Sequence, residues 1–127
     1  MSYKISHDIP DNLLESYLSE SEIAVDTELH GLRLYRDEVC LIQLCDDKNN
    51  VSLIKPENNQ TPPNLKRLFT DQSVQKIFHF AITDVAFIKT SLNIEVKPFF
   101  CTKVMSKLIR TYTQDHGLKD LIMEIHG

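Results

Sequence analysis

Hydrophobic and polar residues alternate along residues 22–31, EIAVDTELHG, in the pattern of a half-buried β-strand. Because alternate side chains of a strand share a face, the apolar residues take one face, and Asp26 and Glu28 take the other. Two apolar runs follow, VCLIQLC at 39–45 and VSLI at 51–54, each preceded by turn residues. The spacing of the three segments predicts an antiparallel meander.

The remainder of the chain alternates between helical and extended patterns. Extended segments are predicted at 76–80 and 96–101, the second around a proline. Apolar residues recur at helical spacing in five segments, and we predict helices at 10–18, 64–71, 81–92, 102–110 and 117–125.

This order of elements predicts an α/β fold: a mixed sheet, with an antiparallel meander and then parallel strands, flanked by helices. We expect the strand that starts at Glu22 to be central in the sheet. A length of 127 residues fits one domain, 1–127, with one hydrophobic core.

Composition and charge exclude several classes of protein. No apolar run approaches the ~20 residues of a membrane span, and the N-terminal sequence lacks the pattern of a signal peptide. We therefore expect a cytoplasmic protein with no membrane partner. The three cysteines include no CxxC pair, which argues against a disulfide framework or a zinc site. A net charge of -4 argues against a broad basic surface, so a nucleic-acid partner is expected to be short or held locally.

Three acidic residues are candidates for chemistry. Asp26 and Glu28 lie two residues apart on one strand face, about 6 to 7 Å between Cα atoms, so both can reach one cation. The alternative interpretation is a solvated polar face. Asp84 is expected in the first turn of a helix, where the helix dipole alone already favours an acid. His79 just before it has the alternative interpretation of a core histidine.

Taken together, four segments carry a more specific signal: VDTE, the following CLIQL, KIFHFAITD, and FCTKVMSKLIRTYTQDHGLKDL at 100–121. In this order they resemble the RNase D-like 3'-5' exonucleases of the DEDD superfamily. The last segment is similar more narrowly to the compact nano-RNase C type, which degrades very short RNA. The resemblance covers nearly the whole chain.

The resemblance implies a ribonuclease H-like fold and two Mg²⁺ or Mn²⁺ ions at the scissile phosphate, held by carboxylate oxygens. It implies that Asp26 contacts both ions, that Glu28 binds one and helps to hold the terminal nucleotide, and that Asp84 holds the other. His79 is implied as a supporting residue. The expected substrate contacts are Thr27, Glu28, Leu29, His79 and Lys103. Basic residues of the C-terminal half are either phosphate contacts or a solvated helix face: Lys103, Lys107, Arg110 and Lys119.

The chain departs from the family pattern at one motif. The family carries a fourth carboxylate in a Tyr-x3-Asp motif on a later helix, and no such motif occurs in these 127 residues. We therefore expect a C-terminally incomplete domain without the family's last helices. His116 and Asp120 have the His-x3-Asp spacing of another branch of the superfamily, although they are also explained as an ordinary helix start.

Three functional hypotheses remain open at this point. The first is a metal-dependent 3'-5' exoribonuclease acting on the 3' ends of short RNA. The second is a protein that keeps the fold and binds metal or nucleic acid with impaired or no turnover. The third is a glycosidase with paired carboxylates, which the absence of tryptophan makes weaker. We also expect a homo-oligomer, because the apolar stripe in 117–125 lacks the family's covering helices.

Overall fold

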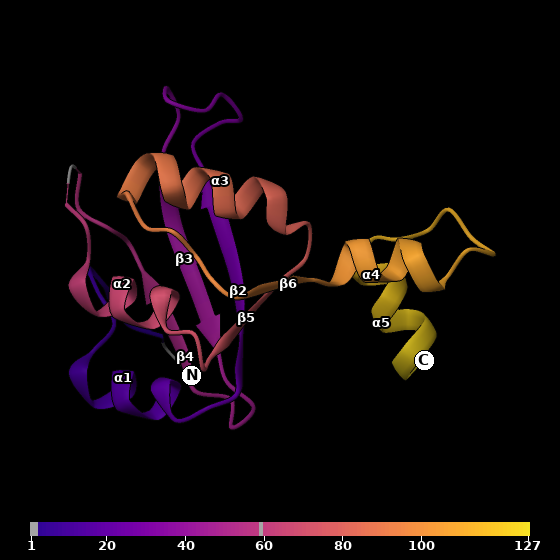
Figure 1. The fold of residues 1–127 in the computed structure, drawn as a ribbon, viewed down its shortest axis with the longest axis horizontal. Helices are drawn as coiled ribbons and strands as arrows, with labels where there is room; N and C mark the ends of the chain where they lie inside the picture. The colour runs from indigo at the N-terminus through magenta and orange to yellow at the C-terminus, as the bar shows by residue number, and fades with distance from the viewer. Residues whose placement is uncertain (1–2, 59) are drawn as a thin grey trace.

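A computed structural model of the chain describes residues 3–58 and 60–127. Within these ranges, six strands form one sheet in the order β1-β4-β3-β2-β5-β6. The strands are β1 (Ile5–Ser6), β2 (Glu22–Leu29), β3 (Val39–Cys45), β4 (Val51–Ile54), β5 (Gln75–Phe78) and β6 (Phe99–Cys101). Strands β2, β3 and β4 are antiparallel, whereas β1, β5 and β6 join the sheet in parallel pairs. The predicted α/β fold, the meander and the central position of β2 are confirmed (Figure 1).

The helices agree with their predicted ranges to within one residue. They are α1 (Asp11–Leu18), α2 (Pro63–Thr70), α3 (Ala81–Leu92), α4 (Thr102–Ile109) and α5 (Leu118–His126). None of the helices in the described part of the chain has the length and apolarity needed to cross a bilayer.

Two predicted extended segments continue beyond the strands found there. The second, 96–101, is a strand only in β6. The first, 76–80, ends as a strand at Phe78, because the chain turns at His79 and Phe80 to enter α3. Phe80 makes this turn in the left-handed helical region, with φ 71° and ψ 51°. Such a conformation is rare for a residue with a bulky side chain.

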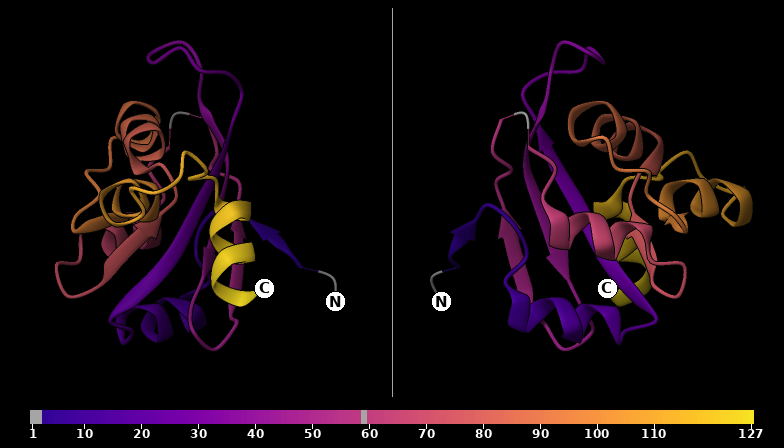
Figure 2. Two further views of the ribbon diagram at one scale, coloured as in Figure 1. Left: turned by 90° about the vertical axis from the view of Figure 1, so that its right-hand side faces the viewer. Right: turned by 60° about the vertical axis from the view of Figure 1, so that its left-hand side comes forward.

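The hydrophobic core lies on one face of the sheet. Helices α1, α2 and α3 bury apolar residues there, including Tyr17, Phe69 and Ile88, against Ile23 and Val25 of β2. Burial of this apolar area is the main term that stabilises the fold. The other sheet face is more accessible and carries Ala24, Asp26 and Glu28 of β2, all exposed, beside half-buried residues of β3. The left view of Figure 2 shows α3 and α5 on opposite sides of β2.

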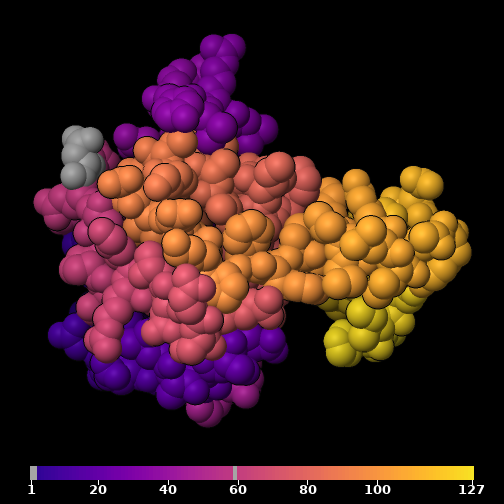
Figure 3. All heavy atoms as spheres, viewed as in Figure 1, coloured from indigo at the N-terminus to yellow at the C-terminus, as the bar shows by residue number. Residues whose placement is uncertain are grey.

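The last 26 residues form a separate projection. Helices α4 and α5 and the loop between them, residues 102–127, extend away from the rest of the molecule (Figures 1 and 3). We call this part the α4–α5 hairpin, and residues 3–58 and 60–101 the sheet body. The two parts are joined through β6, which pairs with β5 at the edge of the sheet.

Candidate active site

Strand β2 places the first two candidate carboxylates on the accessible face of the sheet. Its residues alternate between exposed and buried from Glu22 to Asp26, and Asp26 and Glu28 are both exposed. The pairing of β2 with β3 shifts in register between Glu28 and Leu29. The side chain of Leu29 is half-buried and packs against the hydrophobic core. The face predicted from sequence for the two acids is therefore the observed one.

Helix α3 brings the third acid to the same strand. Asp84 lies in the first turn of α3 and is 9% exposed. The hydroxyl of Thr27, which stands between Asp26 and Glu28 in β2, donates a hydrogen bond to Oδ1 of Asp84. This contact fixes the helix terminus against the strand across 57 positions of sequence. Thr27, predicted to contact substrate, thus uses its hydroxyl inside the protein.

The electrostatics of Asp84 follow from this position. Burial raises the pKa of its carboxyl, the hydrogen bond from Thr27 opposes that rise, and the negative charge of Asp26 adds to it. The two carboxyls come from different elements, and Thr27, which binds Asp84, directly follows Asp26 in β2. A cation between them would relieve the repulsion, because it favours both ionised forms.

The carboxylates do not form a preformed cage. Among residues 3–58 and 60–127, no three His, Cys, Asp or Glu side chains lie close enough together to hold a metal ion as they stand. The type of donor nevertheless fits Mg²⁺ and Mn²⁺, since these hard cations prefer carboxylate oxygens and usually keep several waters. Asp26 and Glu28 are exposed to solvent. The side-chain hydrogen bond of Asp84, from Thr27, uses only the Oδ1 atom.

Gln43 is a further residue of this region that the sequence did not single out. It lies directly opposite Asp26 in the β2–β3 ladder, and its Nε2 is 3.4 Å from Oδ2 of Asp26. The pairing register is the only signal for this contact, and it becomes available once the meander is predicted. Gln43 and Asp26 also line a hollow of ≈ 520 Å³ on the accessible sheet face, together with His79, Thr102 and Leu118.

His79 connects the sheet body to the α4–α5 hairpin. Its Nδ1 lies 2.9 Å from the hydroxyl of Thr102, which itself donates to the carbonyl oxygen of Phe78 at 3.2 Å. A hydroxyl has one hydrogen, so Nδ1 is the donor to Thr102. Burial lowers the pKa of the imidazole, and the nearby Lys103 lowers it further. His79 is therefore fixed by Thr102 at the junction of the two parts, and it lines the same hollow as Asp26.

Comparison with known proteins decides the family. The family model described as "3'-5' exonuclease" matches residues 5–127. The chain belongs to the 3'-5' exonuclease family. Among curated proteins, the exonuclease domain is 31% identical to the exosome complex exonuclease RRP6 of Saccharomyces cerevisiae over 99 residues, 78% of this chain. It is 29% identical to ribonuclease D of Cronobacter turicensis over 97 residues, 76% of this chain.

Solved structures agree with this family and with the nano-RNase C type. The exonuclease domain superposes on Brucella melitensis NrnC with a TM-score of 0.89 and 38% identity over 99% of its length. That protein has also been solved with bound Mg²⁺ and bound to pGG. Escherichia coli RNase D, described as an exoribonuclease involved in structured RNA processing, matches 84% of the chain with 26% identity and a TM-score of 0.66. The resemblance and the ribonuclease H-like fold are confirmed.

The exonuclease domain corresponds to part of each of these proteins. It spans 61% of the NrnC chain and 28% of the RNase D chain. Of the curated relatives, it spans 14% of yeast RRP6 and 26% of the Cronobacter ribonuclease D.

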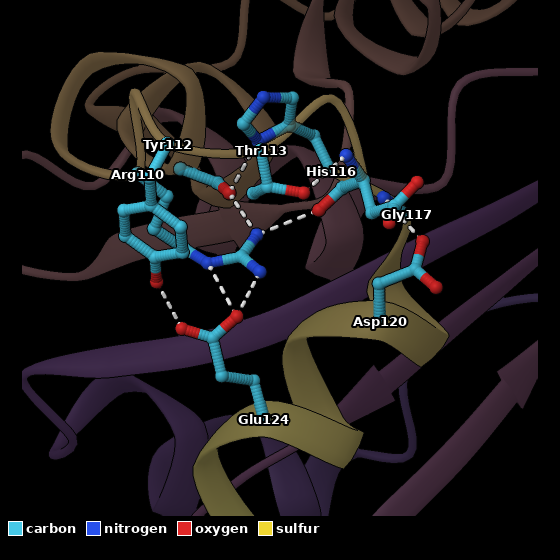
Figure 4. A network of polar contacts seen from close by, with 9 residues as sticks. Arg110, Tyr112, Thr113, His116, Gly117, Asp120 and Glu124 are labelled. Atoms are coloured by element: carbon cyan, nitrogen blue, oxygen red, sulfur yellow. Dashed lines mark hydrogen bonds and ion pairs between the residues drawn. The ribbon is translucent and has the colours of Figure 1, made fainter.

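Two residues with a candidate catalytic spacing are used inside the α4–α5 hairpin of the exonuclease domain. His116 is buried, with Nδ1 2.8 Å from the hydroxyl of Ser106. Asp120 accepts a hydrogen bond from the backbone nitrogen of Gly117 at 3.1 Å and so caps α5. Figure 4 shows both residues among the polar contacts around Arg110. The alternative interpretation, an ordinary helix start, describes them better.

The same network accounts for Arg110, one of the four basic residues considered as phosphate contacts. Its guanidinium donates to Ser106, to the carbonyl oxygen of Asp115 and to the carboxylate of Glu124 (Figure 4). Only 8% of Arg110 is exposed. Lys103 differs, since its ammonium lies 4.5 Å from the ring centroid of Phe80 next to the candidate site.

Proposed function

We propose that the chain is a metal-dependent exonuclease domain that hydrolyses phosphodiester bonds of short RNA from the 3' end. The observation that carries this proposal is the link between β2 and α3. Asp26 and Glu28 stand on the accessible face of β2, and Thr27 between them binds Asp84 of α3. Two carboxylates of β2 and one of α3 thus lie at the same stretch of strand, in a chain of the 3'-5' exonuclease family.

We propose Mg²⁺ or Mn²⁺ as the cofactor and assign the three carboxylates as its ligands. Two such cations at a phosphate activate the attacking water and neutralise the leaving 3'-oxygen. The chain's own part is to hold the ligand oxygens. Asp26 and Glu28 offer their carboxylates from one face of β2, and Thr27 orients Asp84. The Mg²⁺-bound structure of the similar NrnC supports the choice of metal.

Short RNA is the substrate class that we propose. The net charge of -4 argues against a broad basic surface for a long polyanion, so phosphate contacts are expected to be local. The similar NrnC has been solved bound to pGG, which supports a short oligonucleotide. Lys103 beside His79 offers one such local contact.

A single assay tests the proposal. The 127-residue chain is incubated with a 5'-labelled dinucleotide or short RNA and Mn²⁺, in parallel with an Asp26→Asn variant of equal shape. We expect stepwise shortening from the 3' end by the wild-type chain and loss of at least 100-fold in the variant, as for removal of a metal ligand. Wild-type activity no higher than that of the variant would refute hydrolysis. If the chain still bound Mn²⁺ and RNA, the result would support the alternative of a binding protein without turnover.

A second variant pair tests the link between the strand and the helix. Thr27→Val keeps the branched shape and removes the hydroxyl, whereas Thr27→Ser keeps the hydroxyl. We expect Thr27→Val to weaken Mn²⁺ binding by about 10- to 100-fold, the usual effect of losing a partner of a metal ligand, and Thr27→Ser to retain most of the affinity. Calorimetric titration without substrate measures both. Equal Mn²⁺ affinity in the two variants would show that Asp84 needs no partner.

A further inference from the structure

Phe80 stands out by its backbone conformation and its position. It has φ 71° and ψ 51°, a region that glycine adopts easily and that a bulky side chain enters at a cost. It follows His79 directly and precedes Asp84 by one helical turn. Strained residues of this kind tend to occur at functional sites. The ring gains little burial from the strain, because Phe80 is 45% exposed.

Lys103 places a positive charge on the same ring. Its ammonium is 4.5 Å from the ring centroid, within the range of a cation–π contact. Lys103 comes from the first turn of α4, so this contact spans the junction of the sheet body and the α4–α5 hairpin. The lysine is also close enough to His79 to lower the pKa of the imidazole. His79, the neighbour of Phe80 in the sequence, lines the hollow that Asp26 also lines, so the ring and the cation lie next to that hollow.

The ring of Phe80 also borders an open groove. This groove has a volume of ≈ 780 Å³ and is lined mainly by apolar side chains of α3, β6 and α4, among them Ile82, Val85, Phe99 and Val104. A flat apolar group can therefore reach the ring from the groove, while Lys103 supplies the charge beside it. A base attached to a phosphate combines these two properties.

We propose that Phe80 and Lys103 form a nucleobase-binding subsite. A base of the short RNA stacks on the Phe80 ring, and the ammonium of Lys103 pairs with an adjacent phosphate. Stacking on an aromatic side chain is tolerant of base identity, so the subsite supplies affinity and position for any sequence. This inference rests on the proposed function, since it assigns where a part of that substrate binds.

The chain contains no tryptophan, so Phe80→Trp creates a single tryptophan reporter in the ring position. The variant is titrated with a dinucleotide whose linkage is a phosphorothioate, to slow cleavage, and with an abasic analogue of equal charge. We expect saturable quenching of tryptophan fluorescence by the dinucleotide and little change with the abasic analogue. Equal responses to both ligands would contradict stacking and leave phosphate binding alone.

A second pair of variants tests whether the ring of Phe80 contributes to binding of the dinucleotide. Phe80→Gly suits the positive φ and deletes the ring, whereas Phe80→Tyr retains the ring. We expect calorimetric affinity for the dinucleotide to fall roughly 5- to 150-fold in Phe80→Gly, as for the loss of one stacking residue, and to be nearly preserved in Phe80→Tyr. Lys103→Gln is expected to bind more weakly and with a smaller dependence on salt.

Failure of this inference is distinguishable from failure of the proposed function. Wild-type chain that binds and shortens RNA while Phe80→Gly binds it equally well would overturn the subsite alone. Wild-type chain that neither binds nor cleaves the dinucleotide would overturn both. Fluorescence of Phe80→Trp that responds to protein concentration, and not to nucleotide, would assign the ring to contact between copies of the chain and would also overturn the subsite.

Discussion

The sheet body and the α4–α5 hairpin differ in the residues that they bury: mainly hydrophobic residues in the first and mainly polar residues in the second. In the sheet body, a cluster of twenty buried hydrophobic residues lies between the sheet and helices α1, α2 and α3. All residues of the hairpin are described, and four of them are buried. Three are polar, Ser106, Arg110 and His116, and Leu121 is hydrophobic. The large apolar residues of the hairpin that are exposed are Val104, Met105, Leu108, Ile109, Tyr112, Leu118, Ile122, Met123 and Ile125.

The difference shows that a polar network holds the hairpin together. Arg110 bridges the loop and both helices through Ser106, Asp115 and Glu124, and Tyr112 donates to the same Glu124 carboxylate (Figure 4). Charge-assisted hydrogen bonds of this type fix geometry well, but they add less stability than buried apolar area does. The hairpin is therefore a defined but weakly stabilised part, and its apolar side chains remain available for contact with another surface.

The largest expected contrast comes from one substitution made in both parts. Ile88 of α3 is fully buried, whereas Ile122 of α5 is 51% exposed. We expect Ile88→Ala to lower the free energy of unfolding by about 2 to 5 kcal/mol through lost burial and a residual cavity. We expect Ile122→Ala to change it by less than about 0.5 kcal/mol. Urea denaturation of both variants measures the difference, and equal losses would show that Ile122 is covered in solution.

Association of the chain is the next contrast. We propose that the exposed apolar face of the hairpin is hidden by contact between copies, because a continuous apolar face of a few hundred Å² is unusual for a monomer. Light scattering is expected to report a homo-oligomer for the wild-type chain. Ile109→Asp, at a side chain that is 67% exposed, is expected to shift the mass toward the monomer. A Gln72→Glu variant in the exposed turn between α2 and β5 adds the same charge to the sheet body and serves as the control. A wild-type monomer at every concentration tested would refute the proposal.

Each part also buries one cation, and the two are stabilised differently. Lys76 in the sheet body is fully buried, and its ammonium donates to the carbonyl oxygens of Asp71, Val74 and Lys97 at 2.8, 2.6 and 3.0 Å. Burial lowers its pKa to about 8. In the hairpin, the hydrogen bond to Glu124 is the main reason that the pKa of Arg110 is raised. Neutral main-chain acceptors satisfy the hydrogens of the lysine, and the negative charge of Asp71 offsets only part of the effect of burial.

This lysine predicts a dependence of stability on alkaline pH. The folded-state pKa of about 8 lies below the ordinary value of 10.5, so between these values the unfolded chain binds a proton that the folded chain lacks. Stability therefore rises with pH through this window, by on the order of 1 to 3 kcal/mol. Urea denaturation from pH 7 to 10.5, compared with Lys76→Met, isolates the contribution. A difference between the two proteins that stays constant with pH would contradict the assignment.

The sequence predicted the sheet body well because its information is local and periodic. Alternation in 22–31 identified the strand and the face of Asp26 and Glu28, and helical spacing in 81–92 gave α3 to the residue. The two-residue β1 was not predicted, since two residues carry no periodicity. Contacts between distant residues were also beyond these patterns. The Thr27–Asp84 bond and the burial of Lys76 depend on how elements meet, which no single segment encodes.

The apolar stripe of α5 is another case in which the sequence pattern predicted the element but not its burial. Its spacing predicted the helix correctly, but of the stripe residues Leu118, Leu121, Ile122 and Ile125 only Leu121 is buried. Amphipathic spacing states which face of a helix is apolar. It does not state whether the chain itself supplies the surface against which that face packs.

The smallest expected effect concerns the polar network in acid. Hydrogen bonds from Arg110 and then Tyr112 lower the pKa of Glu124 below its ordinary 4.5. A lowered folded-state pKa contributes stability that is present above pH 4.5 and is lost as the pH falls through the folded value. Protonation of Glu124 removes the charge that Arg110 binds, so α5 is expected to detach from α4 while the sheet body stays folded. The Glu124 side chain is 43% exposed, so salt and water weaken the effect.

Hydrogen exchange from pH 6 to pH 3, corrected for the intrinsic pH dependence of exchange, measures this loosening peptide by peptide. We expect faster exchange in α5 of the wild-type chain in acid and no acid-induced change in the core helix α3. Glu124→Gln keeps the shape and lacks the titrating group, so its α5 is expected to exchange faster at pH 6 already and to respond little to acid. An identical acid response of the two proteins would mean that the hairpin is held by its apolar contacts. In that case apolar packing, as in the sheet body, would stabilise the hairpin more than the hydrogen bonds of Arg110 do.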